Sequence, residues 1–191
     1  MSKLAINQTE GVEDDLLAAT NIIKISVGDN SRAYAEALKK TAVYYTHIKE
    51  FTKAEEQLKK AYLLLQEYGK KVKNNESLAE TAMLLGDVYR EKADFKTAED
   101  FYKKSKNGYK KIYGDSHPKY LHVVSDLAKV YAEWGNVTEA IDLLTTTTKG
   151  YLFYINEYFP ALTERQKTKF WSIMKADFDF FNALAINYYS E

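Results

Sequence analysis

Few residues in this 191-residue chain could carry out catalysis. It has three histidines, His47, His117 and His122, and no cysteine, which excludes a thiolate nucleophile and a disulfide framework. His117 and His122 flank Pro118, and we find no carboxylate at metal-ligand spacing beside them. A glycine-rich phosphate loop, a GxSxG motif and an HExxH motif are all missing. The sequence therefore predicts a protein that is not an enzyme and has no metal or other cofactor.

Composition narrows the class further. Lysine plus arginine balance aspartate plus glutamate at 27 each, so net charge gives no reason to expect a nucleic acid or an anionic membrane as partner. With 46% hydrophobic residues, eight glycines and two prolines, the chain can bury a core and favours an all-α fold. The N-terminal segment does not resemble a signal peptide, and no apolar run is long enough to span a membrane. We therefore expect a cytoplasmic protein.

The main feature of the chain is an internal repeat. Tyr45 recurs as Tyr89 after 44 residues and as Tyr131 after another 42. The residues that follow each tyrosine repeat as well: Phe51, Ala54, Leu58 and Ala61 in the first copy; Phe95, Ala98, Tyr102 and Ser105 in the second; Val137, Ala140, Leu144 and Thr147 in the third. A constant period of this length is typical of stacked helix pairs, each of which buries its apolar face only against its neighbours.

The first helix of each pair is predicted from apolar and small residues three and four positions apart. Over 33–48 these are Leu38, Thr41, Ala42 and Tyr45, which lie on one helical stripe. Gly86 and Ala98 are expected to meet where two helices of a pair cross. An additional helix is predicted over 12–27 from its isoleucines and leucines, and a long final helix from about residue 163.

Capping motifs are predicted at the starts of the second helices. Thr52 with Glu55 and Asn136 with Glu139 have the spacing of a capping box, in which side chains bond the free backbone N–H groups. Asp94 with Glu99 gives the middle pair an acidic first turn, and Thr163 with Gln166 opens the final helix. The lysines gather late in the second helices, which complements the helix dipole and favours a solvated face over a phosphate-binding edge.

The segment LLGDVYREKADFKTAEDFYKKS, with Leu85, Gly86, Tyr89, Phe95, Ala98 and Tyr102, resembles a tetratricopeptide repeat. The period exceeds the usual 34 residues. The lead-ins VGDNSRAYAEAL and YGDSHPKYLHVV resemble the extended repeats of kinesin light chains, and Gly28 and Gly114 lie two periods apart. The resemblance implies a right-handed α-α superhelix of three helix pairs with a groove for a partner. It also implies that His117-Pro118 is a structural turn.

In this family the first helices line the groove, so the resemblance implies which residues would face a partner. They are Glu36, Lys39, Val43 and His47; Glu80, Met83, Asp87, Arg90 and Glu91; and His122, Ser125, Lys129 and Glu133. Val43, Asp87 and Lys129 stand where a carboxylate-binding repeat would carry asparagine, which disfavours recognition of a peptide C-terminus. A solvated face without a partner is the alternative interpretation of each stripe.

The last 41 residues differ in kind, because 12 of the 27 aromatic residues lie from Tyr151 onward. Apolar groups point to more than one side of the predicted final helix, so Trp171, Phe178 and Phe180 are candidate interface residues for self-association or for packing onto the preceding repeat. The stretch FPALTERQKTKFWSIMKADFDFFNALA is similar to the segment that follows the repeats in bacterial CHAT-domain proteins, which are caspase-like peptidases. Neither residue of their His-Cys dyad can be placed in this chain.

The sequence thus predicts three regions: a flexible N-terminus at 1–11, helical repeats at 12–158, and an aromatic helix at 159–191 that leads into further repeats or another domain. The predicted function is a non-catalytic protein-protein interaction scaffold, the regulatory region of a larger CHAT-type protease. The alternative is a solenoid that recognises nucleic acid or a ribonucleoprotein, which the neutral charge disfavours.

Overall fold

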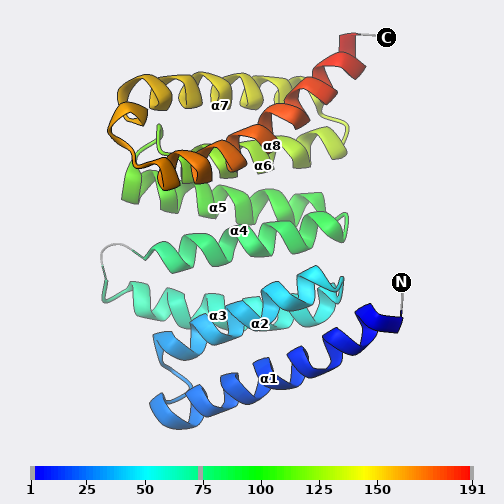
Figure 1. Ribbon diagram of the computed structural model, residues 1–191, viewed down its shortest axis with the longest axis vertical. Coiled ribbons are helices and arrows are strands. Elements are labelled where there is room, and N and C mark those ends of the chain that lie inside the picture. Colours follow the sequence, from blue (N-terminus) through cyan, green and yellow to red (C-terminus); the bar gives the residue numbers. More distant parts are fainter. Residues whose placement is uncertain (1–2, 73–74, 190–191) are drawn as a thin grey trace. The chain divides into compact units, whose positions relative to one another are not determined.

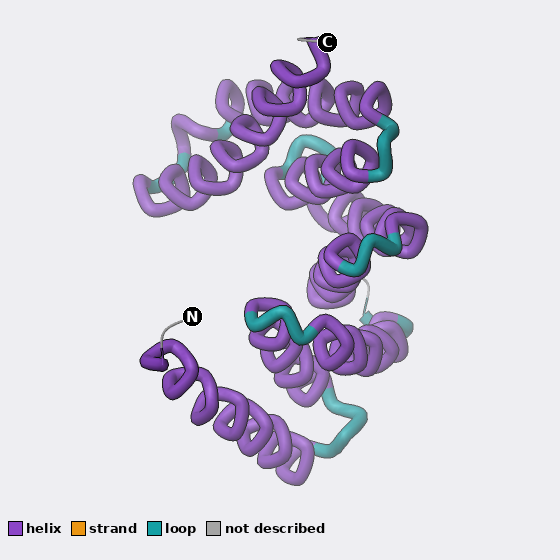
Figure 2. The backbone as a smooth tube through the Cα atoms, turned by 90° about the vertical axis from the view of Figure 1, so that its right-hand side faces the viewer, coloured by secondary structure: helices purple, strands orange, loops and turns teal. Residues whose placement is uncertain are grey.

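The computed structural model describes residues 3–72 and 75–189, and within these residues it contains helices and turns but no strand (Figures 1 and 2). The chain divides into two compact units, residues 1–93 and 94–191. The helices of the first unit are α1 (Lys3–Val27), α2 (Arg32–His47), α3 (Phe51–Gly69) and α4 (Glu76–Glu91). Those of the second are α5 (Phe95–Tyr113), α6 (Pro118–Glu133), α7 (Val137–Glu157) and α8 (Glu164–Tyr189), with a short 3₁₀ turn at Phe159–Ala161.

These bounds confirm the all-α fold and give a helix for each member of the three predicted pairs, which are α2 and α3, α4 and α5, and α6 and α7 in chain order. Helix α1 begins at Lys3, earlier than the expected start at Val12. The flexibility expected for residues 1–11 stays a prediction. The expected boundary at residue 158 stays a prediction as well; α8 contacts α6 and α7 and lies in the second unit with them (Figure 1).

The predicted caps are confirmed at two helices. Asp94 accepts a bond from the backbone N–H of Thr97, although the first turn of α5 itself holds no acidic residue, and Thr163 and Gln166 cap α8 reciprocally. The box at Thr52 is wrong: the N-cap of α3 is Glu50, two residues earlier, and it makes no side-chain cap bond. Asn136 holds the N-cap position of α7, also without such a bond.

The turns that follow the first helices repeat with the same period as the helices. Lys49, Ala93 and Gly135, spaced by 44 and 42 residues, end the first helices with positive φ angles of 64°, 57° and 90°. In this left-handed conformation the chain reverses, and the backbone N–H groups of Glu50 and Asn136 bond the carbonyls of Tyr45 and Tyr131. Glycine adopts this conformation without a steric cost, whereas lysine and alanine adopt it at a steric cost.

His117 confirms the structural turn expected before α6. Its backbone φ of −77° is extended, its Nδ1 accepts the N–H of Lys119, and Pro118 occupies the first helical position. Proline suits that position because its missing N–H would have no helical partner.

Each unit buries its own apolar core. In the first unit Tyr34, Ala35 and Leu38 of α2 pack against Ala61 and Leu65 of α3. All four residues of the predicted first-helix stripe, Leu38, Thr41, Ala42 and Tyr45, are buried as expected.

In the second unit, α8 completes two clusters. Phe170 and Met174 pack with Leu121 and Tyr151, while Phe180 and Phe181 cover a cluster around Leu144. An added Cβ at Gly150 would collide with the side chain of Leu121, so glycine allows α7 to approach α6 closely.

A hydrogen bond repeats between each second helix and the first helix that follows it. The hydroxyl of Tyr45 donates to Glu13 of α1 at 2.8 Å, and that of Tyr89 to Glu55 of α3 at 2.7 Å. Tyr131 donates to Glu99 of α5 in the same way. The glutamates are spaced by 42 and 44 residues, which is the period of the tyrosines. Helix α1 therefore occupies the place of a second helix in the repeat.

Candidate binding face and a buried polar cluster

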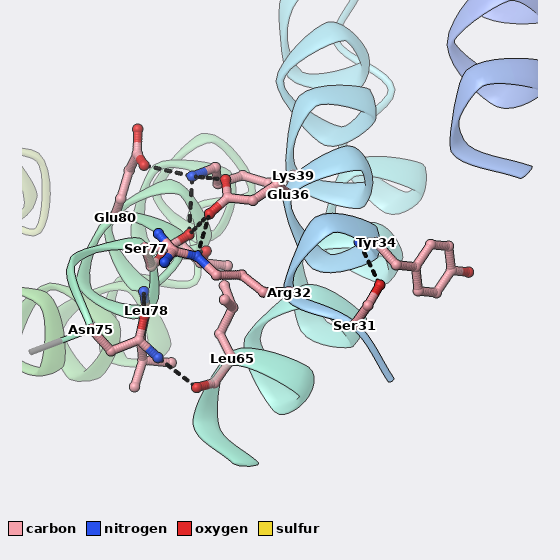
Figure 3. A network of polar contacts seen from close by, with 11 residues as sticks. Ser31, Arg32, Tyr34, Glu36, Lys39, Leu65, Asn75, Ser77, Leu78 and Glu80 are labelled. Carbon is pink, nitrogen blue, oxygen red and sulfur yellow. Dashed lines mark hydrogen bonds and ion pairs between the residues drawn. The ribbon is translucent and has the colours of Figure 1, made fainter. Parts of the chain in front are cut away.

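The expected groove residues of the first unit lie on α2 and α4, and part of them form an ion-pair network (Figure 3). The Lys39 Nζ donates to Glu80 at 2.6 Å and to Ser77 at 3.2 Å, and it pairs with Glu36 at 2.7 Å. Ser77 in turn donates to Glu36. Burial alone would lower the pKa of Lys39, but Glu36 and Glu80 outweigh it and raise that pKa. Lys39 is therefore a cation that holds α2 against α4.

Two open pockets are lined by residues of α2 and α4, and the first of them adjoins this network. One has a volume of about 360 Å³ and is lined by Lys40, Val43 and Leu84 together with the network's charged groups. The other, of about 440 Å³, lies beside His47, Asp87 and Arg90. Val43 is 48% exposed, an unusual position for a branched apolar side chain on an otherwise charged face. Met83 is partly buried, and Glu91, which contacts Arg90, is exposed.

Two of the groove residues expected on α6, His122 and Lys129, belong to a buried polar cluster, the Asp177 cluster, which joins three helices. Lys129 Nζ donates to Asp126 Oδ1 at 2.8 Å and to Asp177 Oδ1 at 3.2 Å. The hydroxyl of Tyr151 on α7 donates to Asp177 Oδ2 at 2.6 Å. His122 lies 3.6 Å from Asp126 and 3.5 Å from Asp177. Asp177, on α8, has only 3% of its side chain exposed.

Charge balance explains how these groups coexist. Burial alone would lower the pKa of His122, but the carboxylates of Asp177 and Asp126 raise it. Burial alone would raise the pKa of Asp177, but His122, Tyr151 and Lys129 together lower it. When His122 is protonated, two cations balance two anions. When it is neutral, the cluster carries an uncompensated negative charge, which is costly in a buried place.

His122, Asp126 and Asp177 could offer three metal ligands, with atoms within 4.8 Å of one another. This corrects our expectation that no carboxylate lies at ligand spacing from His122: Asp126 follows by four residues on the same helix, and folding brings in Asp177. However, the Lys129 ammonium bonds both carboxylates and supplies the positive charge. A second cation there would meet electrostatic repulsion, so the cluster is better explained as a contact that holds α8 in place.

The remaining groove and interface candidates are dispersed. Ser125 is fully buried, and Glu133 is partly exposed. Among the aromatic candidates Trp171 is 50% exposed, whereas Phe178 and Phe180 are partly buried in the cores of their own unit.

Part of the chain matches a known protein family. Residues 77–152 match the family model described as Tetratricopeptide repeat. No curated protein matches the chain by sequence.

Solved structures share the fold at low identity. BtubC (BKLC) from P. vanneervenii has 16% identity and a TM-score of 0.67 over 80% of this chain, which spans 59% of that protein. TPR-like repeats of the kinesin-light-chain kind from Podosopora anserina have 14% identity and a TM-score of 0.66, covering 98% of this chain and 91% of theirs. MamA has 19% identity and a TM-score of 0.55, with coverages of 100% and 92%.

Among the described residues, none of the helices is both long enough and apolar enough to cross a membrane. The repeated helix pairs, the matched segment and the structural relatives all indicate the same fold. The chain has the fold of tetratricopeptide repeats, which solved kinesin-light-chain repeats share.

Proposed function

We propose that this protein is a non-catalytic scaffold that binds a protein partner on the face formed by α2 and α4. The exposed Val43, which lines the pocket of about 360 Å³, carries the proposal. The neighbouring charges are already engaged: Lys39 is held by Glu36 and Glu80. A partner therefore gains most by placing an apolar side chain on Val43 and Leu84, with polar groups beside it.

An extended peptide fits such a face better than a nucleic acid does. Phosphate contacts need clustered and available lysines or arginines, whereas Lys39 is neutralised within the face. Pockets of a few hundred Å³ accept single side chains, and the ordered helices on which they lie need no rearrangement.

Selection of a random peptide library on the purified protein tests the proposal. We expect enriched peptides that share an apolar anchor, and we expect Val43→Glu to weaken their binding at least about tenfold. Leu63→Glu, at an exposed leucine of α3, is the matched control and should leave binding unchanged. Failure to enrich peptides that depend on Val43 would refute the assignment of this face. A strong fall in binding with salt, for a single-stranded oligonucleotide, would support the nucleic-acid alternative instead.

We propose further that the chain is the regulatory region of a CHAT-type protease. The similarity of 159–185 to the segment that follows the repeats in such proteins supports this, as does the capping of α8 by Thr163 and Gln166 at that place. Reading the gene beyond Glu191 tests it: a module with a His-Cys dyad is expected, and a stop codon or an unrelated domain would refute it.

A homo-oligomer that uses α8 is proposed as well, because Trp171 stays half-exposed beside an apolar pocket.

A further inference from the structure

Helix α1 carries the same apolar stripe as the second helices of the pairs. The stripe of α3 consists of Ala54, Leu58, Ala61 and Leu65, all buried. Forty-two residues earlier, on α1, stand Val12, Leu16, Ala19 and Ile23. The bonds of Glu13 and Glu55 to Tyr45 and Tyr89 fix the same offset independently. On α3 this stripe packs against α2, the first helix of its pair.

On α1 no first helix covers the stripe in the described chain. Val12 and Ala19 are exposed, and Leu16 and Ile23 are only partly buried. The contrast is sharpest at Ile22, which is 63% exposed, whereas its counterpart Leu64 packs against the α2–α3 core. Ile23 packs against the same core from α1, so we call the remaining residues, Val12, Leu16, Ala19 and Ile22, the open face of α1. It has the residue pattern of a second helix and lacks a first helix to cover it.

Helix α8 presents the complementary situation. In this fold a first helix lies between two second helices: α2 contacts α1 and α3, and α6 contacts α5 and α7. Helix α8 packs with Phe170 and Met174 toward α6 and α7. Beside that contact, α7 and α8 form an open apolar pocket of about 600 Å³, the α7–α8 pocket. Its walls include Leu152 and Ile155 of α7 and Trp171, Met174 and Phe178 of α8.

We propose that the open face of α1 in one molecule docks into the α7–α8 pocket of a second copy, so that molecules associate head to tail. Both surfaces are apolar, and each is the side that the equivalent helices elsewhere in the repeat bury within a helix pair. They also match in charge: Asp14 and Asp15 are exposed beside the open face, and Lys175, which pairs with the exposed Asp179, lies on the pocket wall with 74% of its side chain exposed. The contact deepens the proposed oligomer of α8 by naming its partner surface, and it leaves the α2–α4 face of each copy unused.

Such an interface is heterologous, since two different surfaces meet, and each molecule keeps one free end after the first contact. Association should therefore continue past the dimer as concentration rises. A symmetric contact between two copies of α8 would stop at the dimer and would not involve α1. This difference makes the proposal testable with two variants and their mixture.

The experiment is sedimentation velocity on the full chain over a concentration series, with Ile22→Glu and Trp171→Glu as the variants. Both positions are largely exposed, so each variant should fold, which circular dichroism checks; Leu152→Glu is a second variant of the pocket wall. Leu63→Glu, at a leucine 62% exposed on α3, is the control for an added charge. We expect wild type and control to form species beyond the dimer, and each variant alone to associate at least about tenfold more weakly.

An equimolar mixture of Ile22→Glu and Trp171→Glu gives the decisive result. Each variant retains the surface that the other has lost, so the mixture should form dimers and stop there. A wild type that stays monomeric, an Ile22→Glu variant that associates like wild type, or a mixture without dimers would each overturn the proposal. Val43→Glu should associate like wild type, so failure of the peptide-binding face and failure of this interface are separate outcomes.

Discussion

Replacing Asp177 by asparagine should loosen α8 from α6 and α7. The substitution keeps the shape of the side chain and one acceptor oxygen but removes the charge. That charge is bonded by Lys129 and Tyr151, and it faces His122 at 3.5 Å. Since only 3% of the Asp177 side chain is exposed, water cannot replace the lost interaction.

The expected loss in the free energy of unfolding depends on the interactions that each partner of Asp177 keeps. Breaking a buried ion pair by removing one member costs about 3–5 kcal/mol. Lys129 is 17% exposed and keeps its 2.8 Å bond to Asp126, so its loss is smaller. Tyr151 exchanges a bond to a charged acceptor for one to a neutral acceptor, a difference of about 1 kcal/mol. Asp177→Asn should therefore lower the free energy of unfolding by about 2–3 kcal/mol.

Denaturant unfolding, followed by circular dichroism and by tryptophan fluorescence, measures this loss. Trp171 lies on α8 and reports its release. Asp179→Asn is the matched control, because Asp179 is two residues along the same helix, exposed and paired only with exposed Lys175, and the change should stay within about 0.5 kcal/mol of wild type. If Asp177→Asn unfolds like Asp179→Asn, the Asp177 cluster does not hold α8 in place.

Three further outcomes are expected. Tyr89→Phe should cost about 1–2 kcal/mol by removing the bond to Glu55, and Tyr158→Phe, at a half-exposed tyrosine, should cost less; equal melting temperatures for the two would contradict this. The folded protein holds the pKa of His122 above its ordinary 6.5, so the stability that this group contributes is complete below that value and is lost as pH rises through the folded pKa. Wild type should then be more stable near about pH 6 than near about pH 8.5, and a His122→Gln variant with the same pH dependence would refute that role. Ala98→Phe should cost about 1–3 kcal/mol because Ala98 is completely buried, and an unchanged melting temperature would show that its site can accept a phenyl ring.

The repeated helices could be predicted from sequence because spacing alone places residues on a helical face. The stripe that ends at Tyr45, the cap at Asp94 and the box at Thr163 were all readable from residues close together in the chain. The box at Thr52 was wrong because the chain reverses at Lys49 and α3 begins at Phe51, which places Thr52 inside the first turn.

The polar contacts between helices could not be predicted in the same way, since their partners lie more than 20 residues apart. One signal was nevertheless present: Glu13, Glu55 and Glu99 repeat with the period of their tyrosine partners. Asp177 had no such signal, because nothing in the repeat carries an acid at its place, so its contact with His122 could not be predicted from the sequence.

Asp177 also shows how the last junction differs from the others. At α1–α2, α3–α4 and α5–α6 a tyrosine of the first helix donates to a glutamate of the preceding second helix. On α7 the position equivalent to Glu55 is Ile141, and the bond is reversed: Tyr151 of the second helix donates to Asp177 of the first.

The α8 junction also differs from the others in how its stability depends on pH. Burial, and with it the bond to Glu13, raises the pKa of Tyr45 to about 12. Burial alone would raise the pKa of Glu55, but Lys59, Lys92 and Tyr89 outweigh it and bring that pKa to about 2. In a tyrosine–glutamate bond of this kind the glutamate therefore stays charged and the tyrosine stays neutral throughout the neutral pH range. The α8 junction includes His122 and loses a balancing proton as the pH rises. Among the helix junctions described within the two units, the contact of α8 is thus the one whose strength should change near neutral pH, and the α7–α8 pocket should change with it.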